Sequence, residues 1–277
     1  MSSVKLKGLA LSALAVASLA ASRADAATTT INVAVAANFT ATMNALIAAY
    51  KVLNPGTNIT FTSDSSSVLQ TQIINGTRKY DLFLSADKTR PQQLYTTYPT
   101  LITGLPFKYA VGELELWSPK TDVSAGLPAT LTQDVVLANP AAAPYGTAAA
   151  QVLSAKPWSI PWPSTPYPPV GTAHVFVKNN ISTTYTAVKN GTYPMGFIAQ
   201  SSICRVVSGV KRFSSGYHHT YAYNVAPKHS RIEQYAIMLI NHSRTTAQSN
   251  LMRDFVRFMR TNSVGQSIVT SYCYSLT

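Results

Sequence analysis

Hydrophobic and polar positions follow two different periods along the first part of the chain. Residues 31–38 form a run of β-branched and alanine residues, which is typical of a strand buried on both faces of a parallel sheet. The segment 39–53 then places Met43 and Leu46 on one face of a helix, and the Asn-Pro-Gly sequence at 54–56 predicts its end. The pattern therefore predicts a strand followed by a helix.

The same unit recurs to the end of the chain. Further strands are predicted at 59–63, 80–87, 109–117, 135–140, 174–177, 195–200 and 234–240, and further helices at 68–74, 145–153, 181–191 and 250–262. The strand at 109–117 alternates between apolar and polar residues and is expected to be half-exposed. Repeated strand–helix alternation favours an α/β fold with parallel sheets.

The alternation falls into two sets, which predicts two lobes. We expect 27–107 with 225–277 to form lobe 1 and 108–224 to form lobe 2, with a ligand cleft between them. The segment 156–170 carries so many prolines that regular structure is excluded, and we expect it to be a surface excursion.

The N-terminus has the pattern of an export signal. Lys5 and Lys7 precede an apolar stretch at 9–21, and Ala24-Asp25-Ala26 is a small-residue cleavage pattern. We therefore expect a signal peptide at 1–26, cleaved near Ala26, and a periplasmic mature protein. The apolar stretch is shorter than the roughly 20 residues that span a bilayer.

Charge and cysteine content narrow the possible functions. The chain of 277 residues carries 22 Lys and Arg against 10 Asp and Glu, a formal net charge of +12, but the basic residues are scattered. This scatter argues against nucleic-acid binding and leaves either steering of small anions or simple solubility. Cys204 and Cys273 can form one disulfide in an oxidising compartment or remain buried thiols.

Four predicted strand-to-helix corners carry neutral polar residues. They are Asn38, Ser65-Ser66-Ser67, Pro144-Tyr145-Gly146 and Asn180-Ile181-Ser182. In open α/β sheets such corners line the ligand crevice, and the first turn of each helix offers free N–H groups that favour an anion. The alternative is that these residues are ordinary helix N-caps without a ligand.

The residues at these corners resemble a known family. The stretches "VAVAANF", "SDSSSVLQTQIINGTRKYDLFLSAD", "ANPAAAPYGTAAAQVL" and "VKNGTYPMGFIAQSSI" are similar to the periplasmic molybdate-binding proteins. The resemblance implies a type II periplasmic-binding fold that holds one tetrahedral oxyanion, molybdate or tungstate, between two lobes. It also implies a monomer that delivers the anion to the membrane permease of an ABC transporter, without catalysis, cofactor or resident metal.

The resemblance assigns the ligand-binding residues position by position. Asn38 matches a residue that holds the anion from the first corner, and Ser66 matches the serine that binds through its hydroxyl and backbone N–H. Tyr145 matches a lining position of the second lobe, and Ile181 matches a backbone N–H donor. Some members place a tyrosine hydroxyl on the anion from a later strand; this chain has Ala199 there, so Tyr145 is a candidate for that hydroxyl.

Other readings of the sequence compete with this one. A receptor for another solute, such as sulfate or ferric iron, is the main alternative, because Tyr217, Tyr221 and Tyr223 could clamp iron with phenolates. An exported enzyme is less favoured: the chain has no H-E-x-x-H, G-x-S-x-G or Walker-type sequence. His218-His219 is expected to belong to a solvated strand, whose adjacent side chains point to opposite faces.

Asp64 is the one acidic residue beside the serine corner. A carboxylate in the cleft would repel an anion, so we expect this side chain to point outward or to cap a neighbouring helix.

Overall fold

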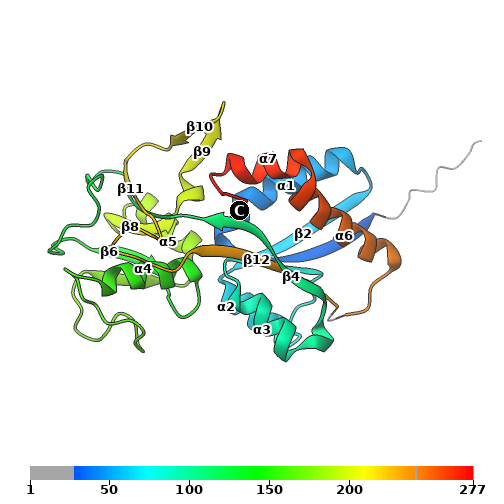
Figure 1. Ribbon diagram of the computed structural model, residues 1–277, viewed down its shortest axis with the longest axis horizontal. Helices are drawn as coiled ribbons and strands as arrows, with labels where there is room; N and C mark the ends of the chain where they lie inside the picture. The colour runs from blue at the N-terminus through cyan, green and yellow to red at the C-terminus, as the bar shows by residue number, and fades with distance from the viewer. Residues whose placement is uncertain (1–27, 241, 277) are drawn as a thin grey trace, which may run out of the picture.

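The computed structural model describes residues 28–240 and 242–276, and within them the chain forms two lobes, each built on a five-stranded sheet (Figure 1). The expected two-lobed α/β fold is confirmed. The predicted signal peptide at 1–26 lies outside the described residues. Within the described ranges, no helix combines the length and apolar content of a membrane span.

The first sheet has the strand order β2-β1-β3-β12-β4. Its strands are β1 (Thr29–Ala36), β2 (Thr57–Asp64), β3 (Leu82–Ser85), β4 (Ile102–Gly112) and β12 (Ile232–Leu239). β1 runs parallel to β2 and β3, whereas β12 is antiparallel to β3 and β4. The parallel strands therefore direct their carboxyl ends to one edge of the sheet.

Helices cover both faces of the first sheet (Figure 1). They are α1 (Thr40–Leu53), α2 (Ser66–Ile74), α3 (Thr89–Thr97), α6 (Thr246–Thr261) and α7 (Ser263–Ser271), with 3-10 turns η1 (Ala37–Phe39) and η2 (Pro99–Leu101). Val33 and Val35 of β1 join one apolar cluster with α1 and α6, whereas Ala34 joins another with α2 and α3. The continuous apolar run of β1 is explained by this burial on both faces.

The second sheet has the order β11-β5-β8-β6-β7. Its strands are β5 (Leu114–Ser118), β6 (Val135–Ala138), β7 (Val175–Lys178), β8 (Met195–Ala199) and β11 (Tyr217–Tyr221). The accompanying elements are α4 (Pro144–Ser154), α5 (Ile181–Lys189), η3 (Gln200–Ser202), β9 (Cys204–Val207) and β10 (Val210–Phe213). β6 is parallel to β7 and β8, so the corners before α4 and α5 lie at one edge.

The chain passes twice between the sheets. β4 ends at Gly112 and β5 begins at Leu114, and the return runs from β11 to β12. The lobe boundaries expected at 107/108 and 224/225 stay a prediction, and we propose to place the crossings at 112–114 and 221–232. Gly112 lies where a Cβ atom would overlap the Tyr145 hydroxyl, so a larger residue would displace that side chain.

The expectation of one half-exposed strand over 109–117 is wrong. The structure divides it between two sheets, and every residue of β5 is buried. Glu115 is fully buried. Its carboxylate has polar partners there: His218 Nδ1 lies 2.8 Å away, and Gln200 Nε2 donates a hydrogen bond to it at 2.9 Å. The polar residue was read as a sign of exposure, but these partners satisfy it inside the protein.

Cys204 and Cys273 form a disulfide, which resolves the alternative left open by the sequence. Cys204 begins β9, beyond the second sheet, whereas Cys273 follows α7 of the first lobe. The bond thus links the lobes covalently beside the two peptide crossings.

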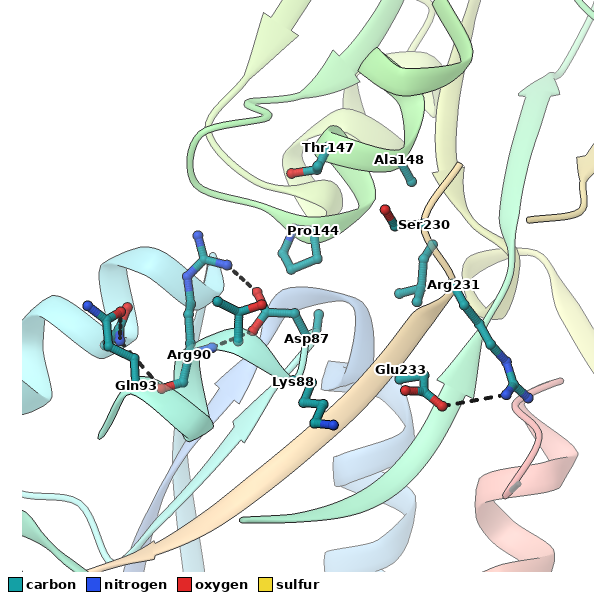
Figure 2. A pocket seen from close by; sticks show the side chains of 14 residues that line it. Asp87, Lys88, Arg90, Gln93, Pro144, Thr147, Ala148, Ser230, Arg231 and Glu233 are labelled. Carbon is teal, nitrogen blue, oxygen red and sulfur yellow. Dashed lines mark hydrogen bonds and ion pairs between the residues drawn. The ribbon is translucent and has the colours of Figure 1, made fainter. Parts of the chain in front are cut away.

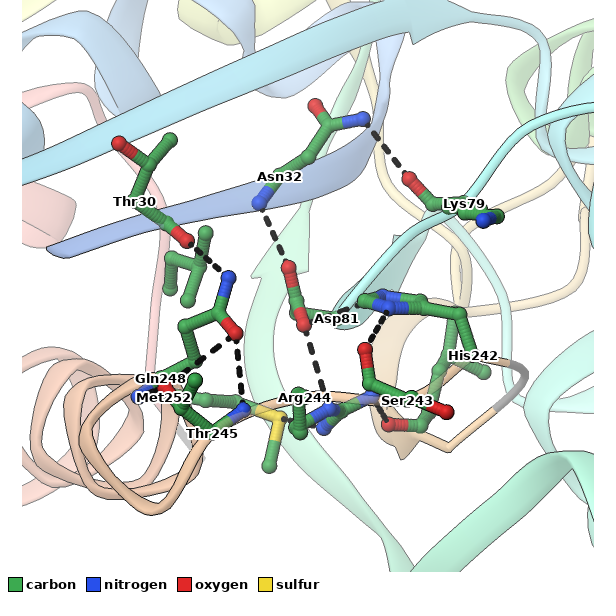
Figure 3. Close-up of polar contacts among 12 residues, drawn as sticks. Thr30, Asn32, Lys79, Asp81, His242, Ser243, Arg244, Thr245, Gln248 and Met252 are labelled. Atoms are coloured by element: carbon green, nitrogen blue, oxygen red, sulfur yellow. Dashed lines mark hydrogen bonds and ion pairs between the residues drawn. The ribbon is translucent and has the colours of Figure 1, made fainter.

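A buried charge cluster fixes the far end of the first sheet (Figure 3). Asp81, 2% exposed, accepts a hydrogen bond from Asn32 N at 2.8 Å. Its Oδ1 lies 3.3 Å from His242 Nε2 and 3.4 Å from Arg244 Nε. These ion pairs tie the segment between β12 and α6 to the start of β3, away from the interlobe cleft.

Candidate functional site

Asn38, Ser66, Tyr145 and Ile181, the four residues proposed for the site, line one cavity between the lobes. The remaining lining residues come from the same corners and from the end of β3: Ala36, Ala37, Ser65, Ala86, Ala143, Pro144 and Asn180. Among the described residues that line it, none is charged. The cavity is small, about 10 Å³, which is the space that a single water-sized sphere requires.

Ser66 is held so that its hydroxyl proton is available to the cavity. It is the first residue of α2 and is 1% exposed, and its Oγ accepts a hydrogen bond from Ala86 N at 3.0 Å. Ser65, the N-cap, accepts from Val68 N instead. Because the Oγ of Ser66 already accepts a bond, its own proton is free to donate, next to first-turn N–H groups without intrahelical acceptors.

Tyr145 and Ile181 bring two more helix starts to the cavity. Tyr145 is the second residue of α4, after Pro144, and Ile181 is the first residue of α5, after the N-cap Asn180. Both are nearly fully buried. The positive ends of α2, α4 and α5 therefore meet at one place, which is the arrangement that favours an anion.

The hydroxyl of Tyr145 is engaged behind the cavity. It accepts a hydrogen bond from Gln234 Nε2 at 3.3 Å. Burial raises the pKa of Tyr145 well above its ordinary value, so this residue stays neutral. That Tyr145 supplies the hydroxyl for an anion stays a prediction; its backbone N–H, in the first turn of α4, is the donor that the geometry favours.

Asn38 connects the cavity to a buried polar network of both lobes. Its Nδ2 donates to Gln234 Oε1 and to the Tyr274 hydroxyl, both at 2.9 Å, and its Oδ1 has no partner. Tyr109 donates to the same Gln234 oxygen at 2.9 Å, and Tyr274 lies 2.9 Å from Ser201 of the second lobe. Asn38 is therefore oriented by groups that lie outside the cavity.

Sequence reasoning missed Gln234 and the tyrosines of this network. Gln234 is fully buried in β12, and Tyr109 and Tyr274 are almost fully buried. The signal was present, because a glutamine opening the apolar stretch "QYAIMLI" is a polar group that needs partners once the strand is buried. What the sequence did not show is that those partners come from strands and a tail far apart in the chain.

Hydrogen bonds across the cleft hold the lobes together around the cavity. Ser67 N donates to Ala142 O at 3.1 Å, and Ser182 Oγ donates to Ala37 O at 2.9 Å. Asp64 does not line the cavity; its Oδ1 accepts from Asn180 Nδ2 of the other lobe at 3.2 Å. The expectation that this carboxylate points outward or caps a neighbouring helix is replaced by another arrangement, in which it contacts the side chain of Asn180, the residue that itself caps α5.

A larger groove adjoins the cavity and shares Ala86 and Pro144 with it (Figure 2). Its volume is about 400 Å³, and it is lined by charged side chains that form pairs. Arg90 pairs with Asp87 and also donates to Ala141 O across the cleft, while Glu233 lies 3.4 Å from Lys108 Nζ. Its lining holds three cationic side chains, Lys88, Arg90 and Arg231, against the two carboxylates of Asp87 and Glu233, so the charges are mostly paired and leave one positive charge in excess.

The clusters named as rivals lie elsewhere. His218 faces Glu115, whereas His219 Nδ1 lies 3.0 Å from Ser124 O, so the two rings do have different partners. Of the tyrosines at 217, 221 and 223, none is among the described residues lining the cavity. Across residues 28–240 and 242–276, no group of three or more His, Cys, Asp or Glu side chains is placed to hold a metal ion.

The profile of the bacterial extracellular solute-binding protein family matches residues 31–275. The chain belongs to this family. It is 38% identical over 128 residues to the molybdate-binding protein ModA of Azotobacter vinelandii, covering 45% of this chain and 50% of that protein. It is 32% identical over 173 residues to ModA of Rhodobacter capsulatus, covering 61% of this chain and 64% of that protein.

These two curated relatives are thus matched over about half to two thirds of their length. The fold extends further. The periplasmic molybdate-binding protein of Azotobacter vinelandii superimposes with a TM-score of 0.72, covering 89% of this chain and 99% of that chain at 24% identity. Each of the three is named as a binding protein, not as an enzyme.

Proposed function

We propose that this protein captures molybdate or tungstate between its lobes and delivers the anion to the membrane permease of an ABC importer. The observation that carries the proposal is the convergence of four separate corners on one small cavity lined by neutral groups. We further propose that it is a periplasmic monomer without catalytic activity, exported by a signal peptide cleaved near Ala26. The ModA proteins to which it is similar bear the name of this ligand.

The chemistry of the lining suits a fully deprotonated dianion. An enclosed dianion loses its hydration, and charge-assisted hydrogen bonds of roughly 1.5–3 kcal/mol each offset that loss. The donors of this kind that we propose are Ser66 Oγ and the backbone N–H groups of Ser66, Tyr145 and Ile181 at the starts of α2, α4 and α5. A protonated phosphate would set its own O–H against donors, so we expect phosphate to be rejected.

The same lining argues against the ferric alternative. A pair of phenolates would be needed, and Tyr145 is the one tyrosine among the described lining residues. Burial raises its pKa, which disfavours the phenolate form that an iron ligand requires.

Calorimetric titration of the purified protein with molybdate, tungstate, sulfate, phosphate and ferric citrate tests the proposal. Tight binding of molybdate or tungstate is expected, and binding of ferric citrate alone would refute it. Ser66→Ala should weaken molybdate binding about 10- to 100-fold, because one charge-assisted hydrogen bond is lost. Ser67→Ala is the matched control, since Ser67 is the next serine of α2 and is not a lining residue.

A further inference from the structure

The side-chain oxygen of Asn38 is a buried acceptor without a partner. Asn38 is 7% exposed and lines the cavity, yet its Oδ1 makes no hydrogen bond. Buried polar atoms are nearly always satisfied, so such an atom calls for an explanation. In a cavity proposed to hold a dianion, an acceptor is also the wrong kind of group, because it repels the ligand oxygens.

The partners of Asn38 decide which end of its amide faces the cavity. Gln234 Oε1 accepts from Asn38 Nδ2 and from the Tyr109 hydroxyl, so that both of its lone pairs are used. Gln234 Nε2 in turn donates to the Tyr145 hydroxyl. As long as Gln234 presents its oxygen to Asn38, the nitrogen of Asn38 is held toward Gln234.

A half-turn of both carboxamides reverses this polarity at the cost of one hydrogen bond, the one from the Tyr274 hydroxyl to Asn38 O. The oxygen and nitrogen of a carboxamide occupy nearly the same volume, so donors and acceptors exchange places while the heavy atoms stay put. Gln234 Nε2 would then donate to Asn38 Oδ1 and to the hydroxyl of Tyr109. Tyr109 keeps an acceptor of its own in Ser85 O, 3.1 Å away.

The remaining contacts change at Tyr145 and Tyr274. The Tyr145 hydroxyl would donate to Gln234 Oε1, and the Tyr274 hydroxyl, which donates to Asn38 O at 2.8 Å, would donate to Asn38 Oδ1 instead. Ser201 Oγ, 3.3 Å from Asn38 O, still donates to that carbonyl. The atom at the unpartnered position becomes the Nδ2 of Asn38, a donor next to the cavity.

We propose that Gln234 is a positioning residue: with the anion bound, the carboxamides of Gln234 and Asn38 are both turned, and Asn38 Nδ2 donates to the anion. This inference rests on the proposed function and extends it to a residue that does not line the cavity. Gln234 also contacts the Tyr145 hydroxyl, but the donor that we propose for Tyr145 is its backbone N–H, so we expect the effect of Gln234 on affinity to pass through Asn38.

A double-mutant cycle on molybdate affinity tests this coupling. Asn38→Ala is expected to weaken binding about 10- to 100-fold and Gln234→Leu about tenfold. In the Asn38→Ala background, Gln234→Leu should change affinity by less than about twofold. Gln200→Leu is the matched control, because Gln200 is equally buried and hydrogen-bonded but is not a lining residue, and it should leave affinity unchanged.

Nuclear magnetic resonance of the unaltered protein reports the orientation of the two carboxamides with and without molybdate. A purely structural role of Gln234 would leave that orientation unchanged on binding. Without molybdate, the Asn38 amide protons should show contacts to the Tyr274 ring. At saturation these should be lost, and contacts from the Gln234 amide protons to the Tyr109 ring should appear. Loss of the corresponding signals in Asn38→Ala and Gln234→Leu assigns them.

The outcomes separate this inference from the function on which it rests. Absence of molybdate binding by the unaltered protein would remove both. Molybdate binding with additive losses in the cycle, or with amide contacts unchanged at saturation, would overturn the positioning role alone. Should Gln234→Leu fail to fold, the measurement on the unaltered protein still decides.

Discussion

Two neighbouring hollows between the lobes differ in almost every physical property. The cavity of Asn38 and Ser66 is about 10 Å³ and is lined by neutral groups, whereas the adjoining groove is about 400 Å³ and is lined by Asp87, Arg90 and Glu233 among others. The groove has charged side chains, most of them paired, Arg90 with Asp87 and Arg231 with Glu233, while Lys88 adds one further positive charge. None of the described residues that line the cavity is charged, but the N-termini of α2, α4 and α5 meet there. The comparison teaches that compensated charges leave little for a ligand, whereas fixed neutral donors remain available to it.

A carboxylate placed in the neutral cavity should have the largest effect. Ser66→Asp is expected to weaken molybdate binding by at least about 1,000-fold, because two unit charges about 4 Å apart repel by about 4 kcal/mol at an effective dielectric constant of 20. The stability should also fall, because Ser66 is 1% exposed and a carboxylate buried there loses hydration that the start of α2 offsets only in part. Calorimetry measures the affinity and thermal unfolding the stability.

Ser67→Asp adds the same charge one residue further on, outside the lining. It should leave most of the affinity intact. Equal losses for both variants would contradict the assignment of the anion to this cavity.

The disulfide belongs to the cavity side of this comparison. Cys273 directly precedes Tyr274, which hydrogen-bonds Asn38 in the network behind the cavity. Replacing both cysteines by serine should lower the free energy of unfolding by about 4 kcal/mol, because the bond closes a loop with a sequence separation of 69 residues. Urea unfolding measures this, and the unaltered protein under reducing conditions should lose a similar amount. A loss below about 1 kcal/mol would show that the bond contributes little.

Alkaline pH should act on the network behind the cavity rather than on the groove. Burial raises the pKa of Tyr274 to about 12, against 10.0 in the unfolded chain. Between these values the unfolded chain releases the proton first, so stability falls as pH rises. A loss of about 2–3 kcal/mol is expected between pH 10 and 12 from Tyr274 alone.

Urea unfolding at pH 8, 10 and 12 measures this effect. Tyr274→Phe is the control, because it removes one titrating group and should reduce the dependence, while burial still raises the pKa values of Tyr109 and Tyr145. A profile that is the same in both proteins would refute the contribution of Tyr274.

Neutralising the groove should have the smallest effect. Arg90→Gln is expected to change molybdate affinity by less than about threefold, because Arg90 is partly exposed and already paired with Asp87. Titrations at low and high salt measure it, with Arg253→Gln on the exposed side of α6 as the control. A loss of tenfold or more specific to Arg90 would place the anion nearer the groove and break the contrast.

The elements with strong periodicity were predictable, and those without it were not. β1 and α1 were expected within a residue or two of their bounds, and α6 was expected to begin at 250 but begins at Thr246, where Thr245 and Gln248 form a capping box. α3 and α7 were missed. α3 is mostly polar, and α7 follows α6 after Asn262 alone, so neither shows a separate apolar stripe.

The site shows the same division between local and distant information. A local signal, neutral polar residues where a strand passes into a helix, selected the four corners, and the family resemblance then named Asn38, Ser66, Tyr145 and Ile181, which the structure brings to one cavity. No local signal joined Gln234 to Asn38, because the two are 196 residues apart and meet only when β12 packs beside the first corner.

The sequence by itself determined the two-lobed α/β architecture and the chemical character of the corners, because periodicity and helix-start residues act over a few positions. The tertiary structure decided the rest: whether Cys204 meets Cys273, where Asp64 points, how small the cavity is, and which group orients Asn38. These depend on contacts between residues far apart in the chain, whose distances are set by packing and leave no pattern in the order of residues.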